Sequence, residues 1–276
     1  MTKEKLTSLE NIKRAYPNLK TIFIVGNGGT GKSTITSKVA DSIHATAYFF
    51  DDNMFWLYPN HPEIIRDIVP AGDYPDFNNP KSILPFHLAN TCKDKKIFSN
   101  FLDVVNDKGE KRLCNDIMKR KSENTNENVA QDTSWLNAGF VREPAVKEKN
   151  NTFIIDSFTP GHKALKQANK IYKISPSNKE IATLFVAKRQ GLVSKKLEEF
   201  LLKGASLADA RKRGFISKEL ENFWGIIDMA NEVVDETLQE DLSGLEYTQL
   251  VNHHKEQSEL EGLANRIIKE YYRDIY

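Results

Sequence analysis

The sequence predicts an α/β protein in which helices cover both faces of a parallel β-sheet. Two observations support this fold class. Runs of β-branched and aromatic residues, typical of strands buried on both faces, lie at 21–25, 47–50, 152–155 and 171–174. Segments with apolar residues at helical spacing lie between and after these runs, and such an alternation builds a parallel sheet. A chain of 276 residues is long enough for one such domain with additions.

The first strand, helix and second strand form a βαβ unit. The strand Thr21–Val25 leads through a glycine-rich turn into a helix predicted over Lys32–Ile43, and Ala47–Phe50 is the second strand. The helix carries an apolar residue at every fourth position of one face. This order of elements places the glycine-rich turn at the carboxyl end of a buried strand, where ligands of parallel sheets gather.

The C-terminal half combines two further strands with a series of helices. Strands are predicted at Thr152–Ile155 and Ile171–Ile174. Ser177 and Glu180 have the spacing of a capping box, which predicts a helix from there toward Arg189. Everything after this helix is predicted to be helical, over 192–203, 206–213, 217–238 and 247–272.

We expect a single domain over residues 1–276 with two additions. Residues 53–150 form an irregular insert that holds most of the prolines and ends in the polar tract Lys119–Ser134. Because long loops in compact domains are either functional or disordered, this insert is a candidate acceptor-binding or lid segment, or an ordinary decoration. Residues 204–276 are predicted to form a helical C-terminal extension.

The composition is that of a globular protein, with 39% hydrophobic and 28% charged residues. A net charge of +1 gives no overall attraction to nucleic acids or anionic membranes. Cys92 and Cys114, the only cysteines, have no metal-type neighbourhood and indicate two thiols in a reducing compartment. The sequence has no apolar leader and no apolar run of membrane-spanning length, so we expect a cytoplasmic protein without a membrane partner.

The glycine-rich turn fits two phosphate-binding patterns. Gly26, Gly28 and Gly31 satisfy the dinucleotide pattern G-x-G-x-x-G, and Asp51 lies where that pattern has its ribose-binding carboxylate. The same turn, followed by Lys32 and serine, satisfies the P-loop pattern G-x-x-x-x-G-K-S.

The first turn of the following helix decides between the two patterns. A dinucleotide site has no task for a cation there, whereas a P-loop uses Lys32 on the β- and γ-phosphates and the hydroxyl of Ser33 on Mg²⁺. The sequence therefore predicts a P-loop NTPase-type fold that binds ATP and Mg²⁺. The predicted nucleotide-binding residues are Gly26, Asn27, Gly28, Gly29, Thr30, Gly31, Lys32, Ser33 and Thr34.

Asp156 is the candidate for a second metal-binding residue. It follows the strand Thr152–Ile155, at the carboxyl end of a buried strand. In the Walker B role it would hold Mg²⁺ directly or through water, together with Ser33. The alternative is a turn or helix-capping aspartate, since Pro160 and Gly161 follow shortly.

The stretch DDNMFWLYPN, Asp51–Asn60, resembles the uridine kinase, phosphoribulokinase and pantothenate kinase group. In these kinases a P-loop, a helix and a strand are followed by an aspartate and aromatic residues. Pantothenate kinases continue with a segment similar to Leu57–Asn60. Asp73–Ile83 is similar to the segment that shapes the acceptor pocket of uridine kinases, and Lys170–Gln190 looks like the late strand and basic helix of the group.

The resemblance implies a kinase that transfers the γ-phosphoryl group of ATP to a hydroxyl of a nucleoside-like or pantothenate-like small molecule. It implies that Asp52 or Asp51 accepts the hydroxyl proton, and that Arg189 or another lid cation clamps the transferred group. Because neighbouring side chains on a strand point to opposite faces, only one of the two aspartates can face the phosphate.

Two alternative functions remain open. In the first, the acceptor is a hydroxymethylated base in DNA, as for P-loop kinases of phage hypermodification systems, and the protein acts in the host cytoplasm. Basic clusters of the insert, such as Lys93–Lys96 and Lys119–Lys121, would then follow the phosphate backbone. In the second, the protein is an NTPase switch or an ATP-binding module. A GTPase is disfavoured because the chain has no Asn-Lys-x-Asp sequence.

Several other conspicuous residues are interpreted as structural. His253 and His254 are predicted at the surface of a polar helix, and Trp224 is predicted in the core. No sequence feature specifies an oligomeric state.

Overall fold

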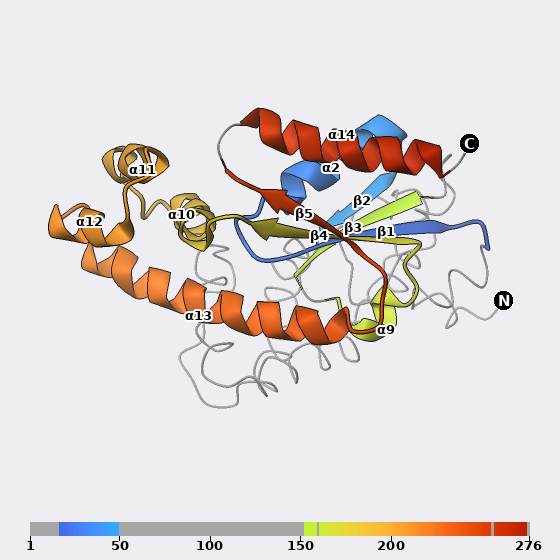
Figure 1. The fold of residues 1–276 in the computed structure, drawn as a ribbon, viewed down its shortest axis with the longest axis horizontal. Helices are drawn as coiled ribbons and strands as arrows, with labels where there is room; N and C mark the ends of the chain where they lie inside the picture. The colour runs from blue at the N-terminus through green and yellow to red at the C-terminus, as the bar shows by residue number, and fades with distance from the viewer. Residues whose placement is uncertain (1–16, 50–151, 159, 255–256, 275–276) are drawn as a thin grey trace, which may run out of the picture.

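The computed structural model describes residues 17–49, 152–158, 160–254 and 257–274. These residues form a five-stranded parallel sheet with the strand order β2-β3-β1-β4-β5 (Figure 1). The predicted fold class is confirmed. The strands are β1 Lys20–Val25, β2 Thr46–Phe49, β3 Thr152–Ser157, β4 Lys170–Pro176 and β5 Thr248–Asn252.

The central strand β1 pairs with β3 on one side and with β4 on the other, and it is buried along almost its whole length. Its end lies level with the end of β3, with Ile24 paired to Asp156 and Val25 to Ser157. The residues that follow β1 and the last residues of β3 therefore meet at one edge of the sheet.

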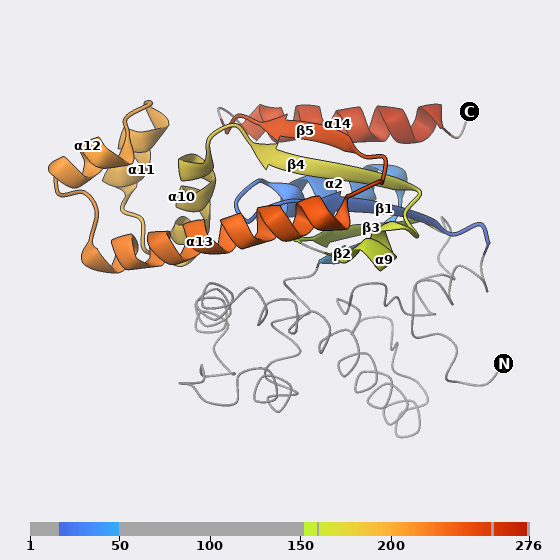
Figure 2. The same cartoon turned by 60° about the horizontal axis from the view of Figure 1, so that its bottom comes forward.

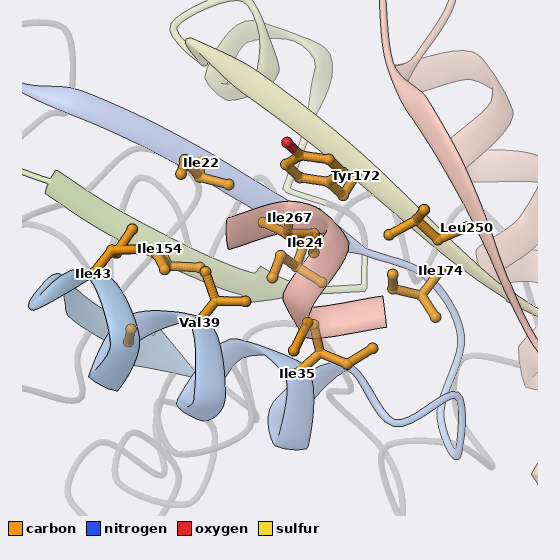
Figure 3. Packing of buried hydrophobic residues seen from close by; sticks show 12 residues of the cluster. Ile22, Ile24, Ile35, Val39, Ile43, Ile154, Tyr172, Ile174, Leu250 and Ile267 are labelled. Atoms are coloured by element: carbon orange, nitrogen blue, oxygen red, sulfur yellow. The ribbon is translucent and has the colours of Figure 1, made fainter. Parts of the chain in front are cut away.

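Alternating side chains of the strands supply the two halves of the core. On one face, helices α2, Lys32–Ile43, and α14, Gln257–Arg273, pack on Ile24, Ile154 and neighbouring residues (Figure 3). On the other face, α9, His162–Leu165, and the end of α13, Lys218–Asp241, cover Phe23 and Phe153 (Figure 2). This alternation follows from the two-residue period of a strand.

A helical unit connects β4 to β5 on the side of the sheet where the strands end (Figure 1). It consists of α10, Lys179–Arg189, α11, Lys195–Leu202, α12, Leu207–Lys212, and the first part of α13. It has an apolar cluster of its own, in which Trp224 is buried as predicted. Of the helices in the described part of the chain, none is both long and apolar enough to cross a membrane.

The prediction that residues 247–272 are helical is wrong for the first part of that segment. Thr248–Asn252 is β5, which pairs with β4 and with no other strand of the described residues. Only Leu250 and Asn252 are buried in it, so the strand lacks the continuous apolar run of the other strands. The predicted extension 204–276 thus contributes both a strand and a core helix to the sheet domain.

The helix starts follow local capping chemistry. The side chains of Ser194, Ser206 and Ser217 accept hydrogen bonds from backbone amides at the starts of α11, α12 and α13. The capping box predicted for Ser177 is wrong, because Asn178 is the N-cap of α10 and accepts from the Ile181 amide at 3.2 Å.

Candidate phosphate-binding site

The turn between β1 and α2 has the backbone conformation of a tightly packed glycine loop. Gly26, Gly29 and Gly31 have φ angles of 143°, 75° and 87°. A Cβ on Gly26 would lie 2.2 Å from the carbonyl oxygen of Ile174, and one on Gly29 would lie 2.0 Å from that of Ala182. The loop therefore lies directly against β4 and α10, and only glycine fits at these two positions.

Helix α2 begins directly after the loop, without a side-chain cap and without an acidic residue in its first turn. Gly31 is the N-cap residue and provides no side-chain hydrogen bond, and the first turn of α2 contains no Asp or Glu. Thr30 Oγ1 donates to the Asn27 carbonyl at 2.8 Å, which closes the loop on itself. A helix start of this kind presents backbone N–H groups and a positive dipole end, which together suit an anion.

Lys32 is buried at this helix start, with 6% of its side chain exposed. Its Nζ donates to the Asn27 carbonyl at 2.9 Å and lies 3.9 Å from Asp156 Oδ1. The same ammonium group lies 4.5 Å from the ring centroid of Phe158, a cation–π distance. The carbonyl, the carboxylate and the ring offset the cost of keeping a cation away from water.

Asp156 occupies its place because β3 is the neighbour of β1. It lies within β3, one residue before the strand ends, and is buried. The following short helix, α9, has Gly161 as its N-cap, so Asp156 does not cap it. The pairing of the two strands sets this carboxylate beside the first turn of α2.

A second polar cluster holds the loop from the side of the helical unit. The Asn27 side chain, which is buried, donates through Nδ2 to Asp235 Oδ1 on α13 at 2.8 Å. Lys179 at the start of α10 donates to the other oxygen of Asp235 at 3.0 Å. Two helices of this unit are thus joined to the loop through one carboxylate.

A third set of contacts holds the loop from the end of β5 and the residues just after it. Asn252 Nδ2 donates to the Thr30 carbonyl at 2.9 Å, and the His254 ring contacts the Gly29 carbonyl through Nε2 at 3.0 Å. Since a carbonyl only accepts, Nε2 carries the proton. His254 also stacks on Phe185 of α10, with 5.5 Å between the ring centroids. The prediction of a surface position for His254 is therefore wrong.

The other predicted site residues are brought together only in part. Ser33 and Thr34 lie half-buried in the first turn of α2, next to Lys32. Arg189 is exposed on the last turn of α10, where it makes no ion pair with any residue that the structure describes. Asp51, Asp52 and the predicted insert 53–150 lie outside the described residues.

Sequence reasoning missed the residues that support the loop from elsewhere in the chain. Asp235 lies 208 positions from its partner Asn27, and His254 lies 225 positions from Gly29. They belong to no contiguous motif, so no spacing could have connected them to the loop. Phe158 is the exception, because it follows the predicted Walker B residue Asp156 by two positions. An aromatic residue at that place was the one local signal for a contact with Lys32.

No three His, Cys, Asp or Glu side chains of the described ranges group closely enough to hold a metal ion by themselves. Mg²⁺ in nucleotide sites commonly takes one or two protein oxygens and completes its shell with phosphates and water. Ser33 and Asp156 offer donors of that kind.

The fold and this site define an α/β protein of the P-loop NTPase type. No family model matches the chain, and no curated protein matches it in sequence. Among solved structures it is similar to a shikimate kinase from Acinetobacter baumannii in complex with shikimate, at 14% identity and a TM-score of 0.38, over 95% of this chain and 98% of the other.

Two further solved structures are similar at the same level. An uncharacterized protein from Eubacterium ventriosum has 13% identity and a TM-score of 0.37, over 94% of this chain and 100% of the other. TT1252 from Thermus thermophilus has 15% identity and a TM-score of 0.35, over 82% and 99%. The class follows from the sheet order and the loop rather than from these distant similarities.

Proposed function

We propose that the protein is a P-loop kinase that transfers the γ-phosphoryl group of MgATP to a hydroxyl of a nucleoside-like or other small molecule. The observation that carries this proposal is the buried pair of Lys32 and Asp156 at the N-terminus of α2. A lysine at the positive end of a helix dipole is unfavourable unless anions compensate it. Asp156 Oδ1, 3.9 Å away, is one such anion, and phosphate oxygens bound at the loop would add further negative charge beside the lysine.

The loop residues fit a nucleotide with its metal ion. The backbone N–H groups over Gly26–Thr34 would hold the phosphates, and Lys32 would neutralise charge on the transferred group. Ser33 and Asp156 provide hydroxyl and carboxylate oxygens, the ligands that Mg²⁺ prefers. Mg²⁺, when bound, offsets the negative charge of the phosphates during transfer.

The acceptor side of the proposal rests on Asp52 or Asp51 and on Arg189. One aspartate takes the proton of the acceptor hydroxyl while the hydroxyl oxygen forms a bond to the γ-phosphorus. The bond between that phosphorus and the bridging oxygen breaks, and ADP leaves with the electron pair. Arg189, or another cation of the helical unit, is the proposed clamp on the transferred group.

The test follows label from γ-labelled ATP into nucleosides, pantothenate-like vitamins and hydroxymethylated DNA. Lys32→Met should lower the rate of transfer by about 10²–10³-fold, because a preorganised charge is lost from the transition state. Lys38→Met is the matched control, since Lys38 lies on the same helix in an exposed ion pair with Glu261, and its rate should stay unchanged.

The outcomes separate the candidate functions. Label in a small molecule supports the proposal, and label only in DNA makes the hydroxymethylated base the acceptor. Full ATP turnover with no acceptor and no labelled product would identify an NTPase. Near-normal transfer by Lys32→Met would contradict the assignment of the loop.

A further inference from the structure

Asn27, the second residue of the loop, takes part in two contacts at once. Its side chain donates to Asp235 Oδ1 on α13 at 2.8 Å, and its main-chain carbonyl accepts from Lys32 Nζ at 2.9 Å. We propose that Asp235 is a positioning residue, which sets the affinity of the loop for nucleotide by fixing Asn27. This inference rests on MgATP binding at the loop, as proposed above.

The orientation of the Asn27 amide depends on Asp235 because the Asn27 side chain makes no other hydrogen bond with the described part of the chain. Asn27 is 4% exposed, and its Oδ1 is buried without a hydrogen-bond partner among the described residues. The amide Nδ2 therefore makes the bond that orients the group. A hydrogen bond to a charged partner is stronger than one between neutral groups, so this single bond can define the side-chain position.

Asp235 is itself fixed from the opposite side. Lys179 at the start of α10 binds its second oxygen at 3.0 Å, and α10 contacts the loop directly where Ala182 lies against Gly29. The carboxylate, the start of α10 and the loop thus form one polar cluster. Its members come from three separate parts of the chain.

The contact with Lys32 makes this cluster relevant to nucleotide binding. The Lys32 ammonium group has three N–H donors, so it can bind a phosphate oxygen while one donor stays on the Asn27 carbonyl. The position of Asn27 therefore affects both the position from which Lys32 reaches the phosphates and the geometry of the loop amides that receive them. Because coupling between two sites is reciprocal, bound nucleotide should in turn stabilise the contact between the loop and α13.

The experiment measures the Kd of MgATP by equilibrium titration without acceptor for four variants. Asp235→Ala should raise Kd about tenfold, the equivalent of about 1.4 kcal/mol. Asp235→Asn, which keeps an oxygen acceptor for Asn27, should restore most of the affinity. Asn27→Ala should match Asp235→Ala, and the double variant should be no weaker than either single variant.

The control is Asp228→Ala. Asp228 lies on the same helix and accepts from Thr183 of α10 at 3.0 Å, so it joins α13 to α10 without reaching the loop. Its Kd should stay unchanged. Thermal melting of every variant separates an effect on binding from a loss of fold. If Asp235→Ala does not fold, the comparison of Asn27→Ala with wild type decides in its place.

Each result supports or overturns the inference. If Asp235 acted only by repelling the phosphates, Asp235→Ala and Asp235→Asn would both bind MgATP more tightly than wild type, and the inference would be wrong. Additive effects of Asn27→Ala and Asp235→Ala would also overturn it. If the wild type transfers phosphate but Asp235→Ala leaves the Kd of MgATP unchanged, this inference alone is wrong. If the Kd values change as expected but no acceptor is phosphorylated, the kinase proposal alone is wrong.

Discussion

Gly29 lies where the loop contacts α10, and its replacement separates two physical effects. Gly29 and Gly191 both have positive φ angles, 75° and 73°. A Cβ on Gly29 would lie 2.0 Å from a backbone oxygen, whereas a Cβ on Gly191 would meet nothing within 4 Å. A side chain at either position would therefore strain the backbone, whereas only a side chain at Gly29 would also overlap with another part of the chain.

We therefore expect Gly191→Ala to lower the free energy of unfolding by about 1–2 kcal/mol, the cost of a left-handed backbone for an L-residue. Gly29→Ala should lower it clearly more and should weaken MgATP binding, because the loop and α10 must separate. Denaturant unfolding of both variants provides the measurement. Equal losses of stability in the two would show that the contact with Ala182 is unimportant.

Asp241 gives a prediction for the pH dependence of stability. Burial raises the pKa of Asp241 above its ordinary value, although hydrogen bonds from the amides of Gly161 and His162 act in the opposite direction. In the pH range just above the ordinary pKa, the folded state therefore binds more protons at this site than the unfolded state does. The contribution of Asp241 to stability falls as the pH rises through the folded pKa.

Asp241→Asn cannot ionise and keeps an oxygen for the Gly161 amide. Between about pH 4 and pH 7, the free energy of unfolding of this variant should increase relative to that of wild type. Parallel denaturant titrations at several pH values measure the difference. A difference that is constant with pH would mean that the pKa of Asp241 is the same in both states.

At the scale of single elements, the start of α10 offers a direct test of the observed cap. Asn178→Ala removes the side-chain acceptor of the Ile181 amide and should cost about 1 kcal/mol of stability. Ser177→Ala should change stability by less than about 0.5 kcal/mol, since among the described residues Ser177 is bonded through its backbone amide alone, to the Asn252 carbonyl. The reverse order of the two effects would restore the cap predicted from sequence.

The elements that sequence predicted well are those with a clear apolar pattern. The four strands β1 to β4 and helix α2 carry continuous or regularly spaced apolar residues, so their positions followed from the pattern. Strand β5 is an edge strand with a single buried apolar residue, Leu250. Because the residues around Leu250 are largely polar, the segment was predicted to be part of a helix. The P-loop was predictable because its residues are contiguous, whereas Asp235, Asn252 and His254 reach it only through the tertiary fold.

At the scale of the whole molecule, the C-terminal helix α14 is part of the core. Ile267 is fully buried among residues of β1, β3 and α2 (Figure 3). Ile267→Ala should lower the free energy of unfolding by about 2–5 kcal/mol, through lost burial and the remaining cavity. Lys269→Ala, two residues further on the exposed side of the helix, should have little effect. If the two variants were equally stable, α14 would not be packed as described.

The strand order also determines when the protein can fold during synthesis. The central strand β1 is made early, but its partners β3 and β4 follow residues 50–151 in the chain. The nascent strand and the glycine loop that follows it therefore cannot pair with β3 and β4 until more than half of the polypeptide has been synthesised. Pairings of such long sequence separation form slowly and leave apolar strands exposed to aggregation in the meantime. We expect the yield of folded protein to depend on translation rate and chaperones more than its final stability would indicate.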